Sequence, residues 1–161
     1  MGLDMYLSAQ KHISKIDWVK AEKIGMEFAI HPEWQRVVDA ADLNGIATDD
    51  VHGCAVKVNA AYWRKANAIH DWFVREVQGG EDECKPHYVD REQLLALKEA
   101  CEQVLADKQK APELLPTASG FFFGSTDYDQ YYFEDLQSTI DIVDRCMALP
   151  TSWDFEYRSS W

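Results

Sequence analysis

Two aromatic-rich blocks carry the side chains of this chain that could recognise or transform a ligand. The first runs from Tyr62 to Phe73 and the second from Leu114 to Tyr128. Each mixes bulky rings with polar side chains or glycines more densely than a plain core element needs, which is typical of a recognition surface. The residues predicted to bind are Trp63, Arg64, Asn67, His70, Gly120, Gly124, Ser125, Asp127, Tyr128, Tyr131 and Tyr132.

The first block predicts a helix across about 60–77. Trp63, Asn67 and His70 are three or four residues apart, so on a helix their side chains meet along one flank. The indole could stack on a ligand, the amide and imidazole could donate and accept hydrogen bonds, and Arg64 could meet an anion or a partner carboxylate. The structural alternative is that Trp63 covers the core edge, Asn67 satisfies a loop backbone and His70 is a buried, hydrogen-bonded histidine.

The second block places a Gly124-Ser125 turn directly before a helix. The amides at such a helix start could bind an anion, but Asp127 and Asp129 would compete with a phosphate. The glycines also fit neither of the common nucleotide-binding motifs. We therefore interpret them as turn residues around a short buried strand at 121–123. Tyr128, Tyr131 and Tyr132 with the two acids then form a patch typical of protein contacts.

Motifs of catalysis and metal binding are missing from the sequence. It contains no nucleophile elbow and no zinc-protease helix motif, so no catalytic residue and no cofactor is predicted. His52, Cys54, Cys84 and His87 could supply a tetrahedral zinc site. Their arrangement fits unrelated thiols and surface imidazoles better, so no metal site is predicted.

The charge balance narrows the choice of partners. Twenty-eight acids against sixteen bases give a net charge of −12, which disfavours direct binding to nucleic acid. The acidity is explained either by solubility or by mimicry of nucleic acid toward a basic groove on another protein. No apolar run reaches the roughly 20 residues that cross a bilayer, and no secretory signal is visible. We therefore expect a cytoplasmic protein without a membrane partner.

Hydrophobic periodicity outlines the remaining elements. Two-residue alternation predicts strands at 3–7, 51–58 and 153–157, and a possible strand at 26–30, while 16–24 fits a strand or a short helix. Helices are expected at 33–43, from Asp90, where Asp90 and Gln93 resemble a capping box, to about Lys108, and at 133–147, entered through Asp127 or Asp129. The pattern predicts an α+β single domain over 1–161, with three main helices packed on one face of a largely antiparallel sheet and the first strand beside the last.

The start Met1-Gly2-Leu3-Asp4-Met5-Tyr6-Leu7, together with the two aromatic blocks, resembles a family of small uncharacterised bacteriophage and prophage proteins. The resemblance covers the N-terminal strand and roughly 62–140, so that 14–50 is interpreted as a member-specific insertion. It implies a non-enzymatic accessory protein in a host bacterial cell that binds a host protein or small ligand, a counter-defence inhibitor being one version. Two alternatives stay open: a small enzyme acting on a nucleotide or phosphorylated metabolite through His70 and Arg64, and a structural or homo-oligomeric component.

Overall fold

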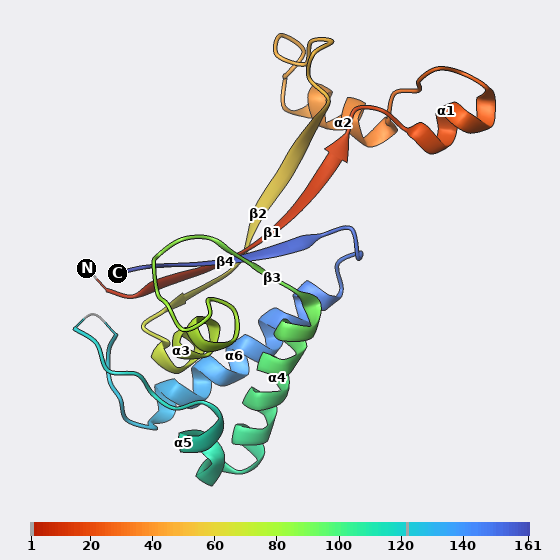
Figure 1. Ribbon diagram of the computed structural model, residues 1–161. Helices are drawn as coiled ribbons and strands as arrows, with labels where there is room; N and C mark the ends of the chain where they lie inside the picture. The colour runs from red at the N-terminus through yellow and green to blue at the C-terminus, as the bar shows by residue number, and fades with distance from the viewer. Residues whose placement is uncertain (1, 122) are drawn as a thin grey trace. The chain divides into compact units, whose positions relative to one another are not determined.

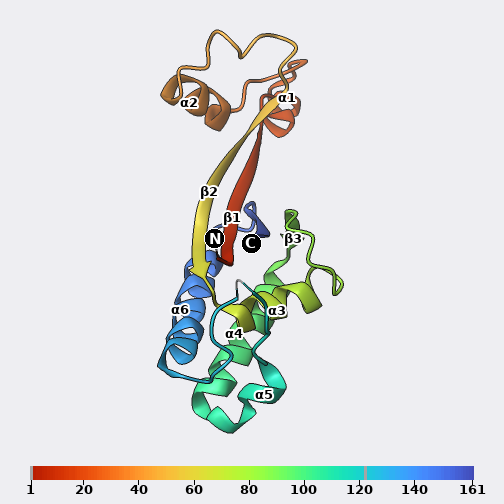
Figure 2. The same ribbon diagram turned by 90° about the vertical axis from the view of Figure 1, so that its left-hand side faces the viewer.

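The computed structural model describes residues 2–121 and 123–161 and shows an α+β protein with a four-stranded antiparallel sheet and six helices. The chain divides into two compact units. The first combines the N-terminal residues up to Ala9 with Val58–Trp161, and the second is Gln10–Lys57. Strands β1 (Asp4–Ser14) and β2 (Gly53–Arg64) each continue from one unit into the other, and they lie side by side (Figures 1 and 2).

The strand order of the sheet is β2-β1-β4-β3, with β3 at His87–Val89 and β4 at Asp154–Ser160. The first strand therefore lies beside the last, which confirms the predicted neighbours. Strand β4 alternates in burial: Phe155, Tyr157 and Ser159 are buried, while the residues between them are half-buried or exposed. A sheet with one buried and one solvated face explains the two-residue period seen in the sequence.

Four of the six helices belong to the first unit: α3 (Asn67–Glu76), α4 (Arg91–Ala106), α5 (Ala111–Leu114) and α6 (Gln130–Met147). A short 3₁₀ turn, Lys108–Lys110, joins α4 to α5. Helix α4 starts with the predicted capping box, in which Asp90 and Gln93 each bond the other's backbone amide. Helix α6 starts after Asp129, whose carboxylate accepts from the Tyr132 amide. Helices α4 and α6 pack along each other, and α3 contacts α6 (Figure 1).

The second unit holds the other two helices, α1 (Trp18–Ile24) and α2 (Pro32–Ala40), around a small core of Ile13, Trp34 and Val38. The stretch 16–24, open between strand and helix in the sequence, thus contains a helix. The strand predicted at 26–30 is wrong, because only an isolated bridge between Ile16 and Ile30 forms there. The segment 14–50, interpreted as an insertion, lies inside this unit.

The helix predicted across 60–77 is wrong in its first third. Strand β2 continues to Arg64, Lys65 adopts a positive φ of 61°, and α3 begins only at Asn67. Two-residue alternation was the deciding pattern here: Ala61 and Trp63 are buried, whereas Tyr62 is 51% exposed. Pairing with β1 prevails over the helical stripe because it satisfies the backbone up to the bond from the Lys65 amide to the Leu3 carbonyl.

The short strand predicted at 121–123 is also wrong, since 121 and 123 belong to a loop. Phe121 is 96% exposed and Phe123 is half-buried against the core. Phe122, like Met1, lies outside the described residues. The glycines predicted as turn residues do lie in this loop, which spans 115–129 and connects α5 to α6.

Candidate functional site

A cavity of about 340 Å³ opens where β2 ends, between the first turn of α3, the 115–129 loop and the first turns of α6. This volume lies in the range of natural ligand sites. Seven of the residues predicted to bind line it: Arg64, Asn67, Gly124, Ser125, Asp127, Tyr131 and Tyr132. The structure therefore gathers most of the predicted set around one hollow, although it does so from a strand end and a helix start rather than from one helix flank.

Asn67 builds the wall of this cavity and has no free hydrogen-bonding group for a ligand. Its side-chain amide donates to the carbonyls of Phe123 (3.1 Å) and Ser125 (2.7 Å), and its oxygen accepts from the Ala118 amide (3.1 Å). Asn67 is buried, and it anchors the loop at three places. The geometry therefore fits the structural alternative for Asn67, in which the side chain satisfies the backbone of a loop.

Further bonds hold the same loop. The Tyr132 hydroxyl donates to the Leu115 carbonyl (2.8 Å), and the Thr117 hydroxyl donates to the Thr126 carbonyl (2.9 Å). Gly124 has a φ of 91°, and a Cβ at this position would lie 3.2 Å from the Lys65 Cβ. A side chain at 124 would therefore be strained and crowded against the end of β2. The loop wall is thus pre-organised by hydrogen bonds and by close backbone approach.

Charged side chains of both signs line the cavity without pairing with one another. In the part of the chain that the structure describes, Arg64, Lys65, Asp127 and Asp135 form no ion pair, whereas other lysines and acids do, such as Lys11 with Glu33 (2.7 Å). The acidic and basic side chains of the lining are therefore too far apart to form ion pairs with one another.

Asp135, on the second turn of α6, is the most perturbed of these groups. Burial, and then the nearby charges of Asp129 and Glu134, raise the pKa of Asp135 from 3.8 to about 6. Its carboxylate has no hydrogen-bond partner among the described residues. A carboxyl group that titrates near neutrality inside a cavity is a typical mark of a functional site.

Trp63 and His70 do not line the cavity. Both are sealed inside the first unit, 4% and 1% exposed, so the prediction that they belong to a solvent-reachable surface is wrong. The Trp63 indole donates to the Thr139 hydroxyl on α6 (3.0 Å). Gly120 and Tyr128 also lie outside the lining: Gly120 adjoins the Phe123 ring, and Tyr128 packs edge-on against Tyr132 at 5.0 Å.

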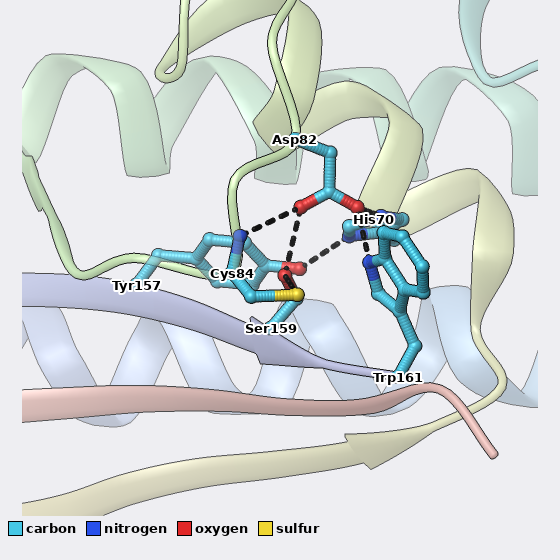
Figure 3. Close-up of polar contacts among 6 residues, drawn as sticks. All are labelled: His70, Asp82, Cys84, Tyr157, Ser159 and Trp161. Carbon is cyan, nitrogen blue, oxygen red and sulfur yellow. Dashed lines mark hydrogen bonds and ion pairs between the residues drawn. The ribbon is translucent and has the colours of Figure 1, made fainter. Parts of the chain in front are cut away.

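His70 instead belongs to a buried network centred on Asp82 (Figure 3). Its Nε2 lies 2.9 Å from an Asp82 carboxylate oxygen, and its Nδ1 lies 2.8 Å from the Tyr157 hydroxyl. A carboxylate only accepts, so Nε2 carries the hydrogen and Nδ1 accepts from Tyr157. Ser159 and Trp161 donate to the same carboxylate, at 3.0 and 2.5 Å. The carboxylate ties the 79–86 loop to α3 and to the C-terminal strand.

Burial sets the protonation states in this network. It lowers the pKa of His70 despite the Asp82 charge, so the imidazole is neutral near pH 7. Burial also raises the pKa of Asp82, but the hydrogen bond from Trp161, the electrostatic interaction with His70 and the hydrogen bond from Ser159 bring it below its usual value. Tyr157 is fully buried, and burial raises its pKa well above 10. His70 itself is buried, and both of its ring nitrogens have partners inside the fold, which fits the structural alternative for His70.

Several residues of the cavity and of the His70 network were not in the predicted set, among them three charged groups. Lys65 and Asp135 line the cavity, and Asp82 holds His70. A signal for Asp135 does exist in the sequence, because it follows Tyr131 by four residues and therefore shares a face of α6 with it. Asp82 offers no such signal, since its partners Ser159 and Trp161 lie more than seventy residues away along the chain.

Over residues 2–121 and 123–161, no three His, Cys, Asp or Glu side chains gather as a metal ion requires. Over the same residues, no helix combines the length and apolarity needed to cross a membrane. Comparison of the chain with protein families, curated proteins and solved structures gives no match.

Proposed function

We propose that this chain is a non-enzymatic binding protein whose cavity at the end of β2 accepts a charged group of a host protein or a small ligand. The observation that carries the proposal is the set of charges that form no ion pair: Arg64 and Lys65 at the end of β2, Asp127 in the 115–129 loop and Asp135 on α6. Asp135 is the half-buried member of this set, and burial opposes its charge. A buried charge without a partner is costly, and a ligand group of opposite charge beside it would relieve that cost.

The construction of the cavity supports the same function. Asn67 holds three backbone groups of the 115–129 loop, so the wall keeps its shape without a ligand. A pre-organised wall lowers the entropy that binding would otherwise cost. At the rim, the Tyr131 ring is 75% exposed and is free to contact a partner. Exposed tyrosines at the edge of a polar hollow are common in interfaces.

The resemblance of the two sequence blocks to bacteriophage and prophage proteins supplies the context for the proposal. In that context the protein acts in the cytoplasm of a host bacterial cell and binds a host factor. A counter-defence inhibitor is one concrete version. The net charge of −12 favours a basic, nucleic-acid-handling partner over nucleic acid itself.

A second function, a small enzyme acting on a nucleotide or phosphorylated metabolite, is favoured by one observation. Asp135, with its pKa raised to about 6, has the property of a general acid or base, and it shares the cavity with Arg64 and Lys65, which could hold a phosphate. In this version Asp135 takes the role that the sequence assigned to His70. A third, structural or homo-oligomeric role is favoured by the exposed Trp18, Val19 and Phe28 of the second unit.

Affinity capture from bacterial lysate with cavity variants tests the proposal. The double variant Arg64→Gln/Asp135→Asn should lose a stoichiometric partner or ligand that the unmodified protein retains. The matched control Arg158→Gln/Asp141→Asn, which changes the same residue types at exposed positions of β4 and α6, should retain it. Retention by both variants would refute the cavity as the site. Turnover of a metabolite pool by the purified protein, lost on Asp135→Asn, would favour the enzyme instead.

A further inference from the structure

Asp129 lines two hollows, one on each side of the start of α6. The first is the cavity described above, and the second is a groove that includes Lys108, Tyr128, Phe133 and Glu134. In the groove, the Lys108 ammonium lies 4.1 Å from the centre of the Phe133 ring. Lys108 therefore already occupies this groove, beside aromatic rings and acidic side chains. Cation–π contact of this kind stabilises an ammonium or guanidinium group beside a ring.

The cavity on the other side of Asp129 offers the same chemistry without an occupant from the chain. Tyr131 and Asp135 lie four residues apart on α6, so their side chains are neighbours on one face. The Asp135 carboxyl is desolvated, and the negative charges of Asp129 and Glu134 act on it. None of the described cations forms an ion pair with Asp135. The local potential on this wall is therefore negative and not neutralised from within.

The basic residues of the lining, Arg64 and Lys65, lie at the end of β2 beside the N-terminal segment. A methyl group built on Gly2 would lie 3.3 Å from Lys65 Cε and 4.0 Å from Arg64 Nη2. The cavity thus has a cationic wall at the end of β2 and an acidic wall on α6. The cationic wall disfavours a chain that is uniformly basic, and it suits one whose basic residue has a carboxylate nearby.

We propose that the group held by this cavity is a lysine or arginine side chain of a partner protein, with its charge against Asp135 and its stem against the Tyr131 ring. The inference rests on the proposed binding function and names the chemistry of its partner. The net charge of −12 attracts a basic protein and repels nucleic acid and anionic lipid. The exposed Tyr131 at the rim adds the aromatic contact area that anchors of interfaces commonly use.

Fluorescence anisotropy with a labelled peptide tests this inference directly. The probe is a fluorescein-labelled, end-blocked peptide with one arginine and one aspartate separated by a glycine, and the matched peptide carries citrulline in place of arginine. At pH 7.5 and 0.15 M salt the arginine peptide should bind at least about tenfold more tightly than the citrulline peptide, as expected for a charge-assisted hydrogen bond.

Two cavity variants, each with a matched control, distinguish binding of the peptide at the cavity from nonspecific attraction to the net negative charge of the protein. Asp135→Asn and Tyr131→Ala should each weaken binding of the arginine peptide several-fold. The controls Asp141→Asn, an exposed acid on the same helix, and Tyr88→Ala, an exposed ring on β3, should leave it within about twofold. Equal weakening by a cavity variant and its control would overturn the inference, because the attraction would then come from net charge alone.

Failure of the inference and failure of the proposed function give different results. If the arginine peptide does not compete with a captured ligand, yet that ligand needs Arg64 and Asp135, the cavity is a binding site for another chemistry and the inference is wrong. Binding of adenosine monophosphate that depends on Arg64 and survives Asp135→Asn would point to the same conclusion. If neither Arg64 nor Asp135 affects any ligand, the proposed function itself is wrong.

Discussion

Replacing Asp135 with asparagine should stabilise the protein at neutral pH. The pKa of Asp135 is raised from 3.8 to about 6 by burial and by Asp129 and Glu134, so its ionised form is disfavoured in the folded state. At ~1.36 kcal/mol per pKa unit this difference corresponds to about 3 kcal/mol. The side chain is only partly buried, and solvent screens part of the effect, so we expect a gain of about 1–3 kcal/mol.

The change in stability caused by Asp135 depends on pH, and its sign follows from how tightly the folded and the unfolded protein bind the Asp135 proton. Because the folded-state pKa is the higher one, the folded protein binds the proton more tightly than the unfolded chain. The contribution of Asp135 to stability is therefore fully present below about pH 4 and is lost as the pH rises through about 6. Asparagine does not titrate, so the gain on Asp135→Asn should be large at pH 7.5 and should vanish near pH 4.

Urea unfolding followed by tryptophan fluorescence at pH 4.5, 6 and 7.5 would measure this gain. The control is Asp141→Asn, an exposed acid on the same helix, which should change the free energy of unfolding by less than about 0.5 kcal/mol at each pH. An Asp135→Asn variant that is less stable than the unmodified protein at pH 7.5, or a gain that is the same at every pH, would refute the electrostatic description of the cavity.

Three further changes test the structure around the cavity. Asn67→Ala leaves three loop groups without a partner and should lower the free energy of unfolding by about 2–4 kcal/mol, with faster proteolysis in 115–129. His70→Phe removes two hydrogen bonds and should cost about 2–4 kcal/mol at pH 7.5 in urea unfolding. That cost should be smaller at pH 5.5, because burial lowers the pKa of His70 and the stability from its neutral form is lost as the pH falls below about 6.5. Deleting 153–161 removes β4 from between β1 and β3, and circular dichroism should then show no cooperative unfolding.

Much of the fold was predictable because local patterns agree with tertiary packing over most of the chain. The capping box of Asp90 and Gln93 predicts the start of α4, and Asp129 predicts the start of α6. The two-residue alternation at 153–157 predicts β4. The failure at 60–66 has a physical cause: a helical stripe and a strand alternation overlap there, and only pairing with β1 decides between them. Such competition between local pattern and long-range pairing cannot be resolved from spacing alone.

The candidate site was predictable in part for the same reason. Gly124, Ser125 and Asp127 are turn and helix-entry residues whose place beside α6 follows from chain order. By contrast, the meeting of Arg64 with this loop depends on where β2 ends. The burial of Trp63 depends on α6, through Thr139. Contacts between residues more than fifty positions apart carry no periodic signal, so residue type indicated a polar cluster without indicating which members face solvent.

One turn of α3 connects the cavity wall, through Asn67, with the hydrogen-bond network of His70. Asn67 accepts and donates toward the loop, and three residues later His70 holds Asp82. Phe123 contacts both parts: its carbonyl accepts from Asn67, and its ring packs edge-on against the His70 ring at 5.2 Å and against the Trp161 ring at 6.3 Å. Phe123, which precedes Gly124 in the cavity wall, thus contacts the His70 network directly. We therefore expect substitutions of His70 or Trp161 to act on the proposed site through this wall.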